Sequence, residues 1–171
     1  MKKSFNKILG VVLCLLFTFN FSSCDNSQSV PEPANGYVFE GINAEYGSYS
    51  LTLTAKGTGG HYFILNAVSL YCSEPVGSYE EITFRYLRGG DSIKFYVHGN
   101  STVDIQIPKG EYEIYYATGD TWYGEEELFG KDTVYKKCDT TFSFYDDFGQ
   151  PLSIPDGNFS ISKILASEFP N

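Results

Sequence analysis

The stretch Ser92–Gly119 reads SIKFYVHGNSTVDIQIPKGEYEIYYATG, and it decides the fold class. Apolar and polar residues alternate through three runs of about six residues each, with turn residues between the runs. Such alternation puts every second side chain on one face of a strand, as a strand lying over a single core requires. Gly99-Asn100 suits a tight hairpin turn, because such turns need positive φ. Pro108-Lys109-Gly110 connects the next pair of strands.

The same alternation recurs on both sides of this stretch. Further strands are expected around residues 50–54, 62–67, 82–87, 141–144 and 159–162. The run 62–67 is apolar on both faces and is therefore expected at the centre of a sheet. No stretch from residue 36 onward keeps helical spacing for three turns. We therefore predict an all-β fold, a single antiparallel β-sandwich of about nine or ten strands over residues 36–171.

The N-terminus is typical of an export signal. Lys2, Lys3 and Lys7 precede an apolar run, Ile8–Phe21, that is too short to span a membrane. The small pair Ser22-Ser23 follows, directly before Cys24. Residues 1–23 are thus predicted to be a signal peptide.

The sequence Phe21-Ser22-Ser23-Cys24 resembles the lipobox of bacterial lipoproteins, in the relaxed form found in the Bacteroidota, with Phe where Leu is usual. In that family the Cys thiol receives a diacylglycerol and becomes the acylated N-terminus. The resemblance implies lipidation at Cys24, export, and anchoring in the cell envelope, at the outer membrane, with the face left open. Two or three acyl chains would give a stable anchor. An ordinary secretory signal with an incidental Cys is the alternative.

The segment that follows is polar and carries two prolines, so residues 24–35 are expected to be a lipidated N-terminus with a flexible tether. Loss of the three signal lysines moves the formal net charge from −9 to −12. Nucleic acids and anionic lipid surfaces both require clusters of Lys and Arg. This charge therefore excludes nucleic acid as a partner and leaves the lipid on Cys24 as the contact with the membrane.

Two cysteines of the exported chain remain, Cys72 and Cys138, in an oxidising compartment. A disulfide between them would close a long loop and contribute about 4 kcal/mol on the chain-entropy model. Two free buried thiols are the alternative. The sequence leaves both open.

A second stretch, Gly119–Thr133, reads GDTWYGEEELFGKDT and holds the only Trp of the chain. Its glycines permit backbone angles closed to other residues and indicate a fixed loop. In one interpretation its apolar side chains cap the open end of the sandwich: Trp122, Leu128 and Phe129. In the other, the loop is an exposed platform that stacks sugar rings and accepts their hydroxyl hydrogen bonds. The platform residues would be Trp122, Tyr123, Asp120, Glu125 and Glu126.

The motifs IPKGEY, YATG, WYG and LFG succeed one another between residues 105 and 130. This series resembles a cassette of small exported bacterial β-domains of unassigned function, and IPKGEY is also similar to PEGA-type and other transthyretin-like sandwich modules. The resemblance covers roughly residues 60–164. It implies an exported sandwich, Ig-like or transthyretin-like, and it implies no reaction.

No catalytic residue, metal site or cofactor is predicted. His61 and His98 lack metal-ligand spacing. Two carboxylate pairs could serve a hydrolase only if they faced each other across a cleft: Asp120 with Glu126, and Asp146 with Asp147. We expect a non-enzymatic binding or accessory module that contacts an envelope protein or glycan. The alternatives are a carbohydrate-binding module that uses Trp122 and Tyr123, and an unrecognised hydrolase.

Overall fold

The computed structural model describes residues 28–42, 48–76, 79–86, 91–145 and 151–170. The predicted signal peptide, Cys24 and the Asp146–Asp147 pair lie outside these ranges. Within them, no helix is long and apolar enough to cross a membrane.

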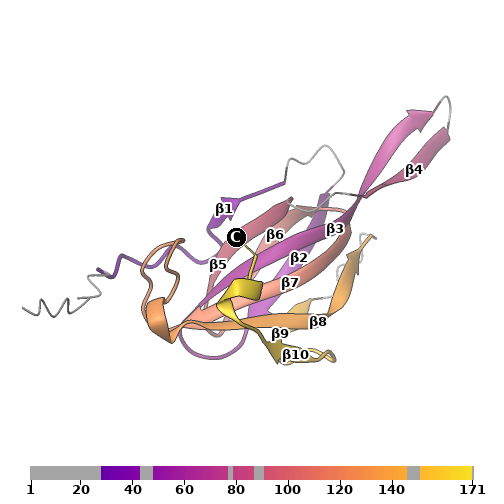
Figure 1. Ribbon diagram of the computed structural model, residues 1–171. Helices are drawn as coiled ribbons and strands as arrows, with labels where there is room; N and C mark the ends of the chain where they lie inside the picture. Colours follow the sequence, from indigo (N-terminus) through magenta and orange to yellow (C-terminus); the bar gives the residue numbers. More distant parts are fainter. Residues whose placement is uncertain (1–27, 43–47, 77–78, 87–90, 146–150, 171) are drawn as a thin grey trace, which may run out of the picture.

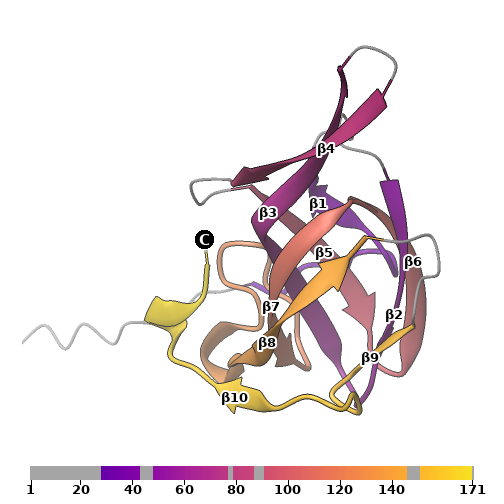
Figure 2. The same cartoon turned by 90° about the vertical axis from the view of Figure 1, so that its right-hand side faces the viewer.

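The described strands form two sheets that pack face to face (Figures 1 and 2). The large sheet has the order β1 (Val38–Glu40), β5 (Ser92–His98), β3 (Gly60–Val76), β7 (Gly110–Gly119), β8 (Val134–Phe144) and β10 (Ile161–Lys163). β4 (Tyr79–Tyr86) also belongs to it and pairs with β3. The small sheet has the order β6 (Ser101–Pro108), β2 (Ser48–Ala55) and β9 (Leu152–Ile154). The single turns η1 (Gly130–Asp132) and η2 (Ala166–Glu168) are 3₁₀-helical.

This arrangement confirms the predicted all-β sandwich and its number of strands. The pairs are antiparallel with one difference from the prediction, because β2 and β9 run parallel. A parallel pair needs a long connection, and the chain between β2 and β9 includes six other strands. β1 and β9 are only three residues long, too short to show an alternating pattern in the sequence.

The predicted hairpin at Gly99-Asn100 is wrong. β5 pairs with β1 and β3, whereas β6 pairs with β2, so this turn carries the chain from the large sheet to the small one. The turn is tight, with Asn100 at φ 56°. The Pro108-Lys109-Gly110 connection returns the chain to the large sheet. Alternation alone does not distinguish a hairpin from a connection between two sheets. In both cases each of the two strands turns its apolar side chains toward the same core.

The core between the sheets consists of the alternating apolar side chains that the pattern identifies. Phe63 and Leu65 of β3 face Leu51 and Leu53 of β2 across it, and all four are fully buried. The opposite face of β3 is buried as well, since Tyr62 and Ile64 belong to a second apolar cluster. β3 is therefore a central strand, as predicted.

β3 continues beyond the body of the sandwich. Its ladder with β7 ends at Leu70 opposite Gly110, after a register shift between Ala67 and Ser69. From there to Val76 it pairs with β4, and the two strands form a ribbon that projects from the end of the molecule (Figure 1).

Of the two alternatives for the cysteines, the disulfide between Cys72 and Cys138 is not formed. Cys138 is a free, fully buried thiol on β8. The register places Cys138 near Ile114 of β7, which pairs with Leu65 of β3. Cys72 lies seven residues further along β3 than Leu65, which corresponds to about 23 Å. A disulfide requires Cα atoms about 4.4–6.8 Å apart. The alternative of a free buried thiol therefore holds at Cys138.

Candidate functional site

Two irregular segments cover the outer face of the large sheet, opposite the small sheet (Figure 2), and a third runs along β5. We call them the Trp loop (residues 120–133), the N-terminal strap (residues 30–37) and the C-terminal segment (residues 164–170). The apolar side chains of the Trp loop and the C-terminal segment, with Phe39 of β1, bury the outer side chains of β3, β5 and β7 in a second cluster. The sheet therefore has two apolar faces, and its outer face requires a cover.

The Trp loop is held by its own backbone. Tyr123 N–H donates to the carbonyl of Leu128, and Leu128 N–H donates to the carbonyl of Gly124, both at 2.7 Å. Gly124, Leu128 and Gly130 all have positive φ, a conformation that non-glycine residues rarely adopt. At its base, the Phe129 side chain packs so closely on Gly119 that a Cβ there would overlap it. The loop is fixed, as its glycines predict.

Trp122 is buried, with 3% of its surface exposed. Its ring contacts Tyr96 and Phe129 edge-on, at centroid distances of 5.2 and 5.3 Å, and stacks on Tyr62 at 5.9 Å. Leu128 and Phe129 are buried in the same cluster. The capping interpretation is therefore correct about burial, but the loop caps the outer face of the large sheet and not the open end of the sandwich. Trp122 cannot serve as an exposed platform.

The structure divides the other predicted platform residues between two depressions. Glu125 and Glu126 line a groove on one side of the Trp loop. Asp120 and the half-buried Tyr123 line a second, more polar depression at the strand ends, together with Thr58 and Thr118. Asp120 and Glu126 therefore do not face each other across a cleft, and this carboxylate pair of the hydrolase alternative is not formed.

The groove has a volume of about 430 Å³ and opens to solvent. Tyr62 and Ile64 of β3 form its floor, and the Trp loop and the C-terminal segment form its two walls. The remaining lining residues come from the Trp loop, the C-terminal segment, β5 and β8: Lys94, Glu125, Glu126, Leu128, Tyr135, Ala166, Phe169 and Pro170.

Two polar contacts fix the charges in the groove. The Tyr62 hydroxyl donates to Glu125 Oε1 at 2.8 Å. Burial, with the hydrogen bond to Glu125 and the charge of that carboxylate, raises the pKa of Tyr62, so this hydroxyl stays a donor. Lys94 Nζ lies 2.8 Å from Glu40 Oε2 on the neighbouring β1. Glu125 is thus held in place, and the charge of Lys94 is balanced.

The N-terminal strap is attached to the body, which contradicts the expectation of a flexible tether up to residue 35. Val30 N–H donates to the carbonyl of Trp122 at 3.0 Å, and Gly36 N–H donates to the carbonyl of Tyr96 at 2.8 Å. Asn35 accepts from His98 N–H at 3.0 Å. Polar residues with prolines are typical of linkers, but here their backbone groups pair with β5 and the Trp loop.

Sequence reasoning identified the two carboxylates of the groove but missed Lys94, Tyr135 and Phe169. These three residues come from β5, β8 and the C-terminal segment. The alternating pattern contains a signal for Lys94, because a polar position in β5 must face outward. No pattern in the sequence predicts that Phe169 lines the groove.

Within the described residues, no group of three or more His, Cys, Asp or Glu side chains is arranged to hold a metal ion. Comparisons with protein-family models, curated proteins and solved structures found no significant match to this chain. The geometry of the groove is therefore the basis for a functional assignment.

Proposed function

We propose that this protein is an exported, lipid-anchored, non-enzymatic binding module of the cell envelope, and that its ligand occupies the groove between the Trp loop and the C-terminal segment. The observation that carries the proposal is the groove itself. It combines an apolar floor with a small number of fixed polar groups, which is the usual composition of a ligand site.

The construction of the groove supports binding over a purely structural role. Its floor is the central strand β3 of the large sheet. The wall that carries Glu125 belongs to the Trp loop, which is held in place by the Tyr62–Glu125 hydrogen bond and by the buried Trp122. Because these contacts hold the side chains in place, binding would cost little conformational entropy.

The anchor and the strap together determine the orientation of the site. If Cys24 carries the lipid, only residues 25–29 separate it from the first strap hydrogen bond, at Val30. Five residues span at most about 18 Å. The strap begins at the Trp-loop end of the molecule, whereas the β3–β4 ribbon lies at the opposite end (Figure 1). The Trp-loop end would therefore stay close to the membrane, and the ribbon would point away from it.

Fractionation of cells tests the anchor. Cys24→Ala is expected to move the protein from the membrane fraction to the soluble fraction, because it removes the acylated thiol. A Cys14→Ala variant, altered within the signal peptide, is expected to stay with the membranes. Retention of the Cys24→Ala protein in the membrane fraction would refute lipid anchoring.

Two neighbouring substitutions test the groove. Ala166 lines it, whereas the adjacent Ser167 is exposed and does not. Ala166→Trp is therefore expected to fill the groove and Ser167→Trp to leave it open. An envelope extract, separated into protein and glycan fractions, is added to each soluble variant, and thermal unfolding is followed. A fraction that stabilises the wild type and Ser167→Trp, but not Ala166→Trp, would contain the ligand. Equal responses of the two variants to every fraction would contradict binding in the groove.

A further inference from the structure

We infer that the groove recognises a cationic, amphipathic segment of a partner protein, with Lys or Arg head groups at its acidic rim and apolar side chains on its floor. This inference names the ligand of the proposed function and rests on that function.

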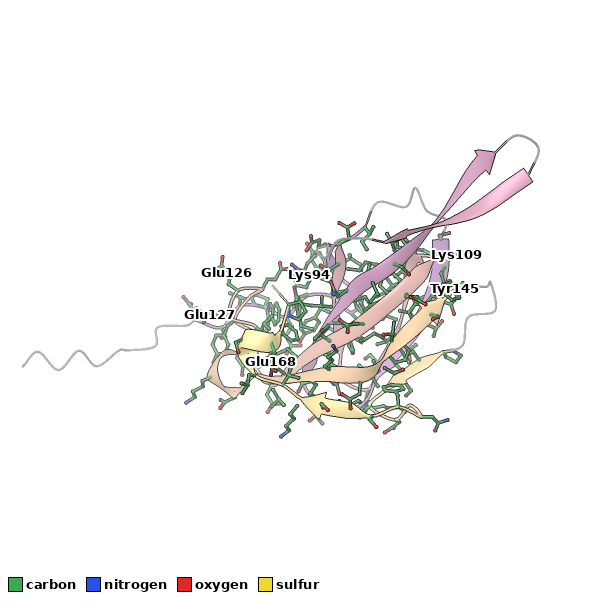
Figure 3. All side chains as sticks on the ribbon, turned by 45° about the vertical axis from the view of Figure 1, so that its right-hand side comes forward. Lys94, Lys109, Glu126, Glu127, Tyr145 and Glu168 are labelled. Atoms are coloured by element: carbon green, nitrogen blue, oxygen red, sulfur yellow. The ribbon has the colours of Figure 1, made fainter. Side chains whose placement is uncertain are left out.

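The rim of the groove is acidic. Glu125 and Glu126 line the wall that belongs to the Trp loop. Glu127 follows them directly, and Glu168 lies between the lining residues Ala166 and Phe169 of the opposite wall. Figure 3 shows Glu126 and Glu127 extending from the Trp loop, and Glu168 on the C-terminal segment. The Glu168 carboxylate accepts from Leu165 N–H at 2.7 Å and does not line the groove, so an anionic ligand would meet the carboxylates of the Trp-loop wall.

The positive charge in the groove does not offset this rim. Lys94 is the one cationic residue that lines it, among those that the structure describes, and its ammonium is paired with Glu40 at 2.8 Å. The Lys94 side chain is mostly buried, with 15% exposed, and it forms part of the inner wall. Because opposite charges across an interface favour association, the rim selects for cationic groups.

The floor selects for apolar groups. Leu128 and Phe169 line it with hydrocarbon and are each less than a tenth exposed, and the half-buried Tyr135 and Pro170 add further apolar surface. Lys and Arg side chains bury their methylene stems on such surfaces while the charged head remains in water. Aromatic rings also attract cations that lie over their faces. A head group that reaches Glu125 would therefore place its stem along the floor.

The extent of the groove favours a polypeptide segment over a single small amine. Its carboxylates, Glu125 and Glu126, lie on the Trp-loop wall, and the opposite wall is apolar, with Phe169 and Pro170, so a ligand gains most when it joins cationic and apolar groups. Glu125 is already oriented by the Tyr62 hydroxyl, so an incoming ammonium or guanidinium group would find an ordered acceptor.

The test measures binding of dye-labelled peptides to the soluble protein by fluorescence anisotropy. The probes are a short peptide of alternating Lys and Leu, a Glu–Leu peptide and a Lys–Ser peptide. The wild type is expected to bind the Lys–Leu peptide, and to bind the other two at least about tenfold more weakly, since each lacks one of the two interactions. Binding is expected to weaken as the salt concentration rises.

Variants assign the binding to the groove. The double variant Glu125→Gln/Glu126→Gln keeps an oxygen acceptor for Tyr62 but removes both charges, and about a three- to tenfold loss of affinity is expected. Ala166→Trp should lose at least about tenfold, and Ser167→Trp should bind like the wild type. Asp156→Asn, in the turn after β9, removes a charge far from the groove and should leave the affinity unchanged. Thermal unfolding of each variant verifies that it is folded.

The outcomes separate this inference from the function on which it rests. If Ala166→Trp blocks a ligand but the Gln double variant binds the Lys–Leu peptide as the wild type does, the groove is a site and the cationic class is wrong. If lysine amide displaces the peptide at equal concentration, the groove recognises a single cation and no segment. If Ala166→Trp and Ser167→Trp bind the peptide alike, the peptide binds elsewhere and the inference falls. The proposed function falls too only if no envelope fraction distinguishes these variants.

Discussion

Replacing Trp122 by Ala tests whether the Trp loop is part of the folded core. The side chain is 3% exposed and lies within 6.0 Å, between ring centroids, of four aromatic rings. An aromatic side chain buries about 150–250 Å², which at about 25 cal/mol per Å² corresponds to about 4–6 kcal/mol. Residual structure in the unfolded chain lowers such values by about 10–40%. We therefore expect Trp122→Ala to lower the free energy of unfolding by about 4 kcal/mol, within the range measured for large-to-small substitutions in cores.

The assay is thermal unfolding followed by circular dichroism. For a domain of this size, each kcal/mol shifts the midpoint by about 2–4 °C, so a decrease of about 8–16 °C is expected. Trp122→Phe keeps a ring in the cluster and should lose about half as much. Thr121→Ala, at the exposed neighbouring position, provides the matched control and should stay within about 0.5 kcal/mol of the wild type.

The wild type also reports on this residue directly, because Trp122 is the only Trp of the chain. A buried indole emits at shorter wavelength than one in water and resists quenching by acrylamide. Emission typical of a solvated indole, together with a midpoint for Trp122→Ala within about 2 °C of the wild type, would refute the burial of Trp122 and the description of the loop as a cover.

Two further predictions concern buried groups that titrate or react. Burial lowers the pKa of His61 below its ordinary value of 6.5, so between that lowered pKa and 6.5 the unfolded chain binds a proton that the folded chain does not. Stability in urea should therefore fall as the pH drops through this interval, and His61→Phe should flatten the dependence; an unchanged slope in His61→Phe would contradict this assignment. Burial, with the charge of Asp139, raises the pKa of the Cys138 thiol to about 12, so Cys138 should resist alkylation at pH 8 in the folded protein. A soluble form that begins after Cys24 should titrate two thiols in urea without reductant, and a value of zero would demonstrate the disulfide with Cys72 that the structure lacks.

The alternating pattern was sufficient to predict the strands but not their partners. Ile93, Phe95 and Val97 lie on the core face of β5, as the alternation within Ser92–His98 predicts for every second residue. The pattern could not reveal that the next strand, β6, joins the other sheet, because pairing depends on which faces meet across the core and not on the order along the chain. The same limitation applies to the parallel contact of β9 with β2, since three residues carry too little periodicity.

The candidate site could be predicted only in part. Glu125 and Glu126 stand out as carboxylates within a glycine-bounded loop that carries the only Trp. Their interpretation as acceptors beside an exposed ring was wrong because Tyr62 and Tyr96 give β3 and β5 an apolar outer face, which the indole covers. A tyrosine within an alternating run suits either a buried or an exposed face, so the pattern did not distinguish the two. Contacts between remote segments, such as those that bring Phe169 to the groove, have no local signature.

The length of β3 connects the two ends of the molecule. At about 3.3 Å per residue its 17 residues extend about 55 Å, from the floor of the groove into the projecting ribbon. Tyr62 and Ile64 lie where β3 is paired on both sides, with β5 and β7, whereas residues 71–76 pair with β4 alone. A ribbon of two strands is only marginally stable without further packing, so local opening would start there and leave the groove floor in place.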